Sequence, residues 1–207
     1  MSNLDHVRWV GGGSGAGKTT VTRLLAERFG IGLYSTDATI SVHSGQLDAT
    51  GAPLLDRFRR MSMDERWADR SPQTMLETFH WFRGEGFGLI VEDLLQLRPD
   101  ERLIVEGFRL LPQLVAPLLR DPSQGAWLLP TPEFRRAAFE SRGSLWRIAE
   151  QTSRPERALS NLLERDRLFT ASLQDMAAAA CLPVIHVDGS LTEEALESRV
   201  ATQFGLR

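Results

Sequence analysis

Glycines followed by a Lys-Thr pair near the amino terminus could together bind a polyphosphate. The run GGSGAGKT occupies residues 12–19 and fits the phosphate-binding pattern G-x-x-x-x-G-K-[ST]. Glycine allows backbone conformations in which successive amide N–H groups point inward at an anion. Lys18 would reach the β- and γ-phosphates of a nucleotide and act in catalysis, and the Thr19 hydroxyl would bind Mg²⁺. Nucleotide contacts are therefore expected from Gly12, Gly13, Ser14, Gly15, Ala16, Gly17, Lys18, Thr19 and Thr20.

The neighbouring sequence supplies the elements that such a loop requires. Residues 6–10 predict a short strand that leads into the glycines, and residues 20–28 predict the helix that follows them. A helix that begins directly after the loop would direct the positive end of its dipole at the bound phosphates.

Asp37 is a candidate catalytic and substrate-binding residue. It follows a second predicted strand, over 32–35, in the sequence YSTDAT. A carboxylate there could accept the proton of a hydroxyl as that hydroxyl attacks the γ-phosphate. The alternative is that Asp37 is the N-cap of the next helix.

Glu106 and Arg109 form a second candidate pair at the end of a third predicted strand, over 102–106. Glu106 could hold Mg²⁺, directly or through water, or contact the substrate; otherwise it is a solvated carboxylate at a strand end. Arg109 could clamp an anionic group of the substrate, or it makes an ordinary surface ion pair.

The remaining pattern predicts an α/β fold of three layers. Further strands are expected over 126–129 and 183–187, and further helices over 73–83, 112–120, 157–180 and from about residue 192. Strands that alternate with helices favour a five-stranded parallel sheet with helices on both faces. The chain, residues 1–207, is interpreted as one domain. Two connections are too long for simple crossovers, and they are interpreted as a substrate-binding insertion over about 40–98 and a lid over about 131–168.

Arginines in the lid segment could close over a phosphoryl group during transfer. Arg142 is favoured because Gly143 follows it as a plausible hinge, and Arg135 and Arg154 come next. The insertion contains several aromatic residues, which either wall an organic acceptor or pack a helix onto the core. These residues are Trp67, Phe79, Trp81, Phe82 and Phe87.

Composition excludes several classes of protein. The net charge of −3 gives no indication of a nucleic-acid partner, and no apolar run approaches the length that spans a membrane. The single Cys181 rules out an intramolecular disulfide and fits a reducing compartment. We therefore expect a cytoplasmic protein without nucleic-acid or membrane partners. No heptad pattern indicates an oligomer.

The sequence resembles the P-loop kinases, a group that includes uridine, pantothenate and shikimate kinases and chloramphenicol phosphotransferase. The likeness rests on the phosphate-binding loop, on STD at 35–37, on VEG at 105–107 and on IHVDGS at 185–190. Motifs of GTPases (N-K-x-D) and of transporter ATPases (L-S-G-G-Q) are missing from the sequence. Nucleoside monophosphate kinases commonly have D-G-F-P-R after the third strand, whereas this chain has EGFRL at 106–110.

The resemblance implies ATP and Mg²⁺ as cofactors and places Asp188, Gly189 and Ser190 beside the adenine. It implies phosphoryl transfer to a hydroxyl of a small molecule. A nucleoside or nucleoside monophosphate kinase is a second hypothesis, and a nucleotide-binding switch with little transfer activity is a third.

Overall fold

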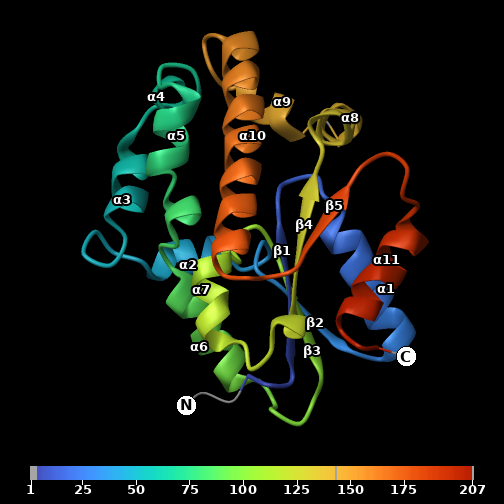
Figure 1. Ribbon diagram of the computed structural model, residues 1–207. Coiled ribbons are helices and arrows are strands. Elements are labelled where there is room, and N and C mark those ends of the chain that lie inside the picture. The colour runs from blue at the N-terminus through green and yellow to red at the C-terminus, as the bar shows by residue number, and fades with distance from the viewer. Residues whose placement is uncertain (1–3, 143, 207) are drawn as a thin grey trace.

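A five-stranded parallel sheet organises the protein, as a computed structural model describes it for residues 4–142 and 144–206 (Figure 1). The strands are β1 (Val7–Gly12), β2 (Gly32–Ser35), β3 (Leu103–Glu106), β4 (Gly125–Pro130) and β5 (Val184–Val187). Their order in the sheet is β2-β3-β1-β4-β5, and every pair is parallel. The strands predicted from the sequence agree with these bounds to within two residues.

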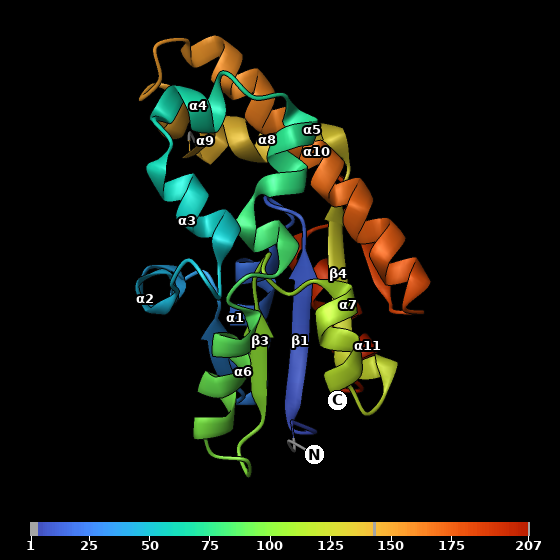
Figure 2. The same ribbon diagram turned by 90° about the vertical axis from the view of Figure 1, so that its left-hand side faces the viewer.

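Helices cover both faces of the sheet because successive residues of the central strands point to opposite sides. In β1, Val10 packs in a cluster with α1 (Lys18–Phe29) and α11 (Glu193–Gln203). The preceding Trp9 packs on the other face, with α6 (Phe87–Gln96), α7 (Pro112–Val115) and Trp127 of β4. Residues buried on both faces are typical of a parallel sheet inside an α/β protein. The three-layer α/β fold is therefore confirmed (Figure 2).

Two predicted helices are shorter than the sequence indicated. The helix expected over 112–120 ends at Val115 and continues as a 3-10 turn, Ala116–Leu118, because Pro117 has no amide hydrogen to donate. The helix expected over 73–83 divides at Phe79, whose backbone is extended, into α5 (Pro72–Thr78) and a 3-10 turn, His80–Arg83. Ser71 caps α5 by accepting a hydrogen bond from the amide of Thr74 at 3.1 Å.

The segment after β2 is almost entirely helical. It contains α2 (Ile40–Gln46), α3 (Pro53–Arg60), α4 (Met63–Trp67), α5 and α6. The carboxylate of Glu85 accepts hydrogen bonds from the amides of Leu54 and Leu55, at 2.8 and 2.9 Å, and so caps the first turn of α3 from a distant part of the chain. Helix α6 returns to the sheet, where Ile90 and Leu94 are buried.

The segment after β4 packs against that first segment. It comprises α8 (Pro132–Arg142), α9 (Ser144–Ala149) and α10 (Pro155–Ala179). The side-chain amide of Asn161 in α10 donates to the carbonyls of Trp67, Ala68 and Arg70 at 3.1–3.2 Å. Ser153 hydrogen-bonds Asp64. Helices α3–α5 and α8–α10 thus form one helical cap above the carboxyl ends of the strands (Figures 1 and 2).

No helix within the described residues has the length and apolar character needed to cross a membrane.

We predict that Asn161→Ala loosens this cap. The substitution leaves three carbonyls without their amide partner, which should lower the free energy of unfolding by about 1–3 kcal/mol. Chemical denaturation measures the loss, and hydrogen exchange should locate it in residues 64–72. Gln151→Ala is the matched control, because its exposed side-chain amide donates to the nearby carbonyl of Arg147 and not to a distant segment of the described chain. Equal stability of the two variants would contradict the prediction.

Candidate functional site

The phosphate-binding loop connects β1 directly to α1. Gly12 ends β1 with φ of 134°, and a Cβ at this position would lie 2.1 Å from the carbonyl oxygen of Leu128 in β4. A larger residue is therefore excluded by both conformation and space. Gly17 then precedes α1 in a left-handed conformation, so the loop reaches the amino terminus of a 12-residue helix.

Lys18 lies across the loop. Its Nζ donates hydrogen bonds to the carbonyl oxygens of Gly12 at 3.2 Å and Gly13 at 2.9 Å. The side chain is only 7% exposed. The ammonium is thus held at the loop that the sequence predicts to bind phosphates.

Glu106 is buried beneath the loop and is held by hydroxyls from two other elements. It is 1% exposed. Thr19 donates to its Oε2 at 3.3 Å, and Ser35, the last residue of β2, donates to its Oε1 at 2.5 Å. Hydroxyl and carboxylate oxygens are suitable ligands for Mg²⁺, directly or through water. The described residues contain no cluster of three or more metal-binding side chains, so a cation here would need oxygens from a nucleotide as well.

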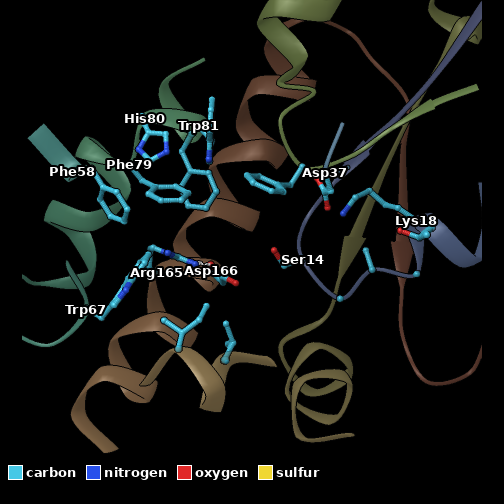
Figure 3. Close-up of a pocket in the computed structure, with 18 residues that line it drawn as sticks. Ser14, Lys18, Asp37, Phe58, Trp67, Phe79, His80, Trp81, Arg165 and Asp166 are labelled. Atoms are coloured by element: carbon cyan, nitrogen blue, oxygen red, sulfur yellow. Dashed lines mark hydrogen bonds and ion pairs between the residues drawn. The ribbon is translucent and has the colours of Figure 1, made fainter. Parts of the chain in front are cut away.

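Asp37 lies beside Lys18 at the edge of a cavity (Figure 3). The next helix, α2, has Thr39 as its N-cap, so Asp37 does not have the alternative role of a helix cap. Thr36 and Asp37 lie close to the end of β3 because residue 107 is glycine. A Cβ at Gly107 would lie 1.8 Å from the Thr36 hydroxyl. The carboxylate is exposed toward the cavity, yet the protein around it removes enough water to raise its pKa, and the charge of Lys18 opposes that rise.

Arg109 is buried and has its hydrogen-bond partners outside the phosphate-binding loop. The residue is 2% exposed, and its guanidinium lies 4.4 Å from the centre of the Trp81 ring. It donates to Nδ1 of His43 at 3.1 and 3.2 Å, and to the carbonyls of Thr36 and Gly86. Because Arg109 can only donate, His43 accepts at Nδ1 and donates from Nε2 to Asp93 at 2.9 Å. The sequence predicted a substrate-binding or surface role for Arg109. In the structure its buried guanidinium packs on the ring of Trp81.

One cavity of about 440 Å³ joins the phosphate-binding loop to the helical cap (Figure 3). At one end it is lined by residues 14–19 and by Asp37. The segment after β2 contributes five aromatic rings to the lining, which are Phe58, Trp67, Phe79, Trp81 and Phe82, and the loop after β3 contributes Phe108, whose amide donates a hydrogen bond to Asp37. The volume is within the usual range for small-molecule sites.

The aromatic rings support one another as well as lining the cavity. Phe79 is near the middle of this group, with ring centres 5.5 Å from Phe58 and 4.8 Å from Phe82. His80 also lines the cavity, and burial together with nearby arginines lowers its pKa to about 3. The imidazole is therefore neutral at pH 7. Of the two functions that the sequence left open for these aromatic residues, packing and walling a cavity, the rings Trp67, Phe79, Trp81 and Phe82 serve both.

Arg165 and Asp166 of α10 also line the cavity, and neither was among the candidates from the sequence. The guanidinium of Arg165 donates to Oδ1 of Asp166 at 2.6 and 2.9 Å and lies 5.1–5.3 Å from three ring centres. The spacing of apolar residues in the sequence could have identified these two positions as buried. Leu162, Phe169 and Leu173 define the buried stripe of this helix, and Arg165 and Asp166 fall on it.

The three arginines favoured from the sequence lie in different surroundings. The stem of Arg135 packs against Gly15 of the loop, and its guanidinium donates to Thr170 at 3.4 Å. Arg154 pairs with Asp69 of the cap. The side chain of Arg142 and all of Gly143 lie outside the described residues.

The loop after β5 lies at the same edge of the sheet as the phosphate-binding loop (Figure 1). Asp188 accepts hydrogen bonds from the amide and hydroxyl of Ser190, at 2.9 and 2.5 Å, which fixes a tight turn through Gly189. These three residues do not line the cavity. Their contact with adenine stays a prediction.

Sequence comparisons identify no relative, since no family model and no curated protein matches the chain. Comparison of folds finds solved structures with a similar architecture. Deoxyadenosine kinase from M. mycoides, with dCMP and dCDP bound, has a TM-score of 0.52 at 11% identity, over 96% of this chain and 98% of that one. The same kinase with dATP bound gives 0.50 at 10% identity, over 96% and 98%. An uncharacterized protein from Eubacterium ventriosum ATCC 27560 gives 0.51 at 14% identity, over 97% and 98%.

At these identities the comparison concerns the fold and not the substrate. The sheet order, the loop between β1 and α1, and near-complete coverage of a kinase structure agree with one another. The chain therefore has the fold of the P-loop kinases.

Proposed function

We propose that this protein is a phosphotransferase that moves the γ-phosphate of ATP, with Mg²⁺, to a hydroxyl group of a small molecule. One observation carries the proposal: a single cavity contains the phosphate-binding loop, the Asp37 carboxylate and a separate wall large enough for an acceptor. A protein that only binds nucleotide has no need for the separate acceptor wall.

The residues of the loop bind and neutralise the phosphates. Lys18 exchanges its carbonyl partners for phosphate oxygens, and the loop amides and the amino terminus of α1 bind the remaining charge. Thr19 and Glu106 would hold Mg²⁺, which supplies further charge neutralisation when it is bound. Asp37 orients the acceptor hydroxyl and takes its proton as the oxygen attacks. Asp188, Gly189 and Ser190 would lie beside the adenine.

Arg135 is the best candidate for stabilising the phosphoryl group. Its stem packs against Gly15 of the loop and its guanidinium has a long hydrogen bond of 3.4 Å to Thr170, whereas the charge of Arg165 is compensated by Asp166. The role of Arg142 stays a prediction, because its side chain lies outside the described residues.

The proposal is tested by ADP release with Mg-ATP in the presence of sugars, nucleosides, nucleoside monophosphates and other hydroxylated compounds. Release that depends on one acceptor class supports a kinase. ATP binding without any acceptor-dependent release contradicts it and favours the nucleotide-binding switch.

We predict that Lys18→Ala abolishes stabilisation by ATP. At ATP near one hundred times its Kd, the wild-type protein should gain about 2.7 kcal/mol of stability, and the variant should gain almost none. Thermal unfolding with and without Mg-ATP measures the difference. Arg23→Ala is the control, because Arg23 is exposed on the same helix and its ion pair among the described residues is with the exposed Glu27. A normal shift in the Lys18 variant would refute the phosphate-binding role.

We predict that Asp37→Asn retains ATP binding and loses turnover by about two orders of magnitude or more. Because the folded protein raises the pKa of Asp37, keeping this carboxylate ionised costs folding free energy at pH 7. The variant should therefore be at least as heat-stable as the wild type, which separates loss of chemistry from loss of folding. Near-normal turnover would remove Asp37 from the mechanism.

The same shift in pKa predicts the acid side of the pH–rate profile. A base must be ionised to act, so turnover should fall as the pH drops through the pKa of Asp37. Since burial raises this pKa above the ordinary value of 3.8, the fall should occur at a higher pH than for an exposed aspartate. Single-turnover rates between pH 4 and 8 measure it. A rate that stays flat throughout this range would contradict the assignment.

A further inference from the structure

The acceptor end of the cavity has a composition that restricts what can bind there. Six aromatic side chains and His80 line it, whereas the aliphatic side chains that line it are Leu145 and Ile148 among the described residues. Phe58, Phe79 and Phe108 are each only partly buried, so part of each ring is available to a bound molecule. Aromatic surfaces pair most favourably with other flat rings, edge-to-face or offset-stacked.

The charges in the cavity argue against a phosphorylated acceptor. Among the described residues that line it, the cationic side chains are Lys18 and Arg165. Lys18 belongs to the phosphate-binding loop. Arg165 is already bonded twice to Asp166, and its guanidinium lies among three aromatic rings. A phosphate on the acceptor would need an arginine or lysine whose charge is not already compensated.

His80 does not supply that charge. It is 2% exposed, and its imidazole is neutral at pH 7 because burial and nearby arginines keep its pKa near 3. The wall formed by His80 and the aromatic rings is therefore uncharged. Asp37 adds a negative charge that would repel an anionic acceptor, whereas the charge of Asp166 is compensated by Arg165.

From these contacts we infer that the acceptor is an uncharged molecule that carries a flat ring and a hydroxyl group, with the ring packed against Phe58, Phe79 and Phe108. The inference rests on the proposed function, whose acceptor it specifies. The ring binds in the cap, and the hydroxyl is directed toward Asp37 and the phosphate-binding loop. The chemistry is shared by nucleosides and by simple aromatic alcohols, so the test contains both.

Calorimetric titration in the presence of Mg²⁺ and a non-hydrolysable ATP analogue separates the requirements with matched pairs of probes. Thymidine against dTMP isolates the effect of a phosphate. The pair 2-phenylethanol and 2-cyclohexylethanol isolates the flatness of the ring, and glucose represents acceptors without an aromatic ring. We expect thymidine or 2-phenylethanol to bind, each more tightly than its partner probe. Tighter binding of dTMP or 2-cyclohexylethanol, binding of glucose alone, or no binding of either ring probe at millimolar concentration would overturn the inference.

Substitution in the wall gives an independent test. Phe58→Leu and Phe108→Leu keep an apolar side chain but remove a ring, so each should weaken binding of the ring probe by roughly three- to tenfold. The affinity for the ATP analogue should stay unchanged. Phe87→Leu is the control, because this ring is also partly buried but packs in the core cluster under α6. Equal affinity of all three variants for the ring probe would contradict the inference.

ADP release with the same probes distinguishes failure of the inference from failure of the proposed function. Release with glucose and not with the ring probes would retain the kinase and discard the ring-bearing acceptor. Binding of a ring probe without ADP release from any probe would retain the acceptor site and discard phosphoryl transfer.

Discussion

The buried carboxylate of Glu106 connects the end of β3 to the end of β2 and to the first turn of α1. It belongs to β3, which lies between β1 and β2, and it accepts hydrogen bonds from Thr19 after β1 and from Ser35 at the end of β2. Burial of a carboxylate is costly unless its oxygens have partners. The sheet register satisfies that requirement, since Glu106 lies opposite both Val10 and Ser35. The positions of the phosphate-binding loop and of Asp37 both follow from this pairing.

The cap adds the second half of the cavity, and its own stability depends on contacts between distant segments. Asn161 and Ser153 connect the α10 side to the α4–α5 side, and an apolar cluster around Trp67 and Leu162 fills the space between them. The aromatic wall is therefore part of a packed core. A wall supported in this way is preorganised, which reduces the entropy that a ligand loses on binding.

Charge is distributed unevenly along the cavity, and this asymmetry separates its two ends. Lys18 and the amino terminus of α1 make the loop end suited to phosphates. At the cap end, Arg165 is compensated by Asp166, and His80 is neutral. Arg109 and Arg66 lie over the rings of Trp81 and Phe58. The protein thus uses its arginines at the cap end chiefly to support aromatic rings.

The sequence by itself determined the parts that depend on short spacing. The loop at 12–19 is local, and the strand ends at Ser35 and Glu106 must meet at one edge of a parallel sheet, so Thr19, Asp37 and Glu106 could be brought together in advance. The tertiary structure decided which of the many arginines face the cavity. Arg165 meets Trp67 and Phe79 across about a hundred residues of chain, and Arg109 turns toward His43. A charged residue can pair with any of several partners, and only the packing of distant helices selects one of them.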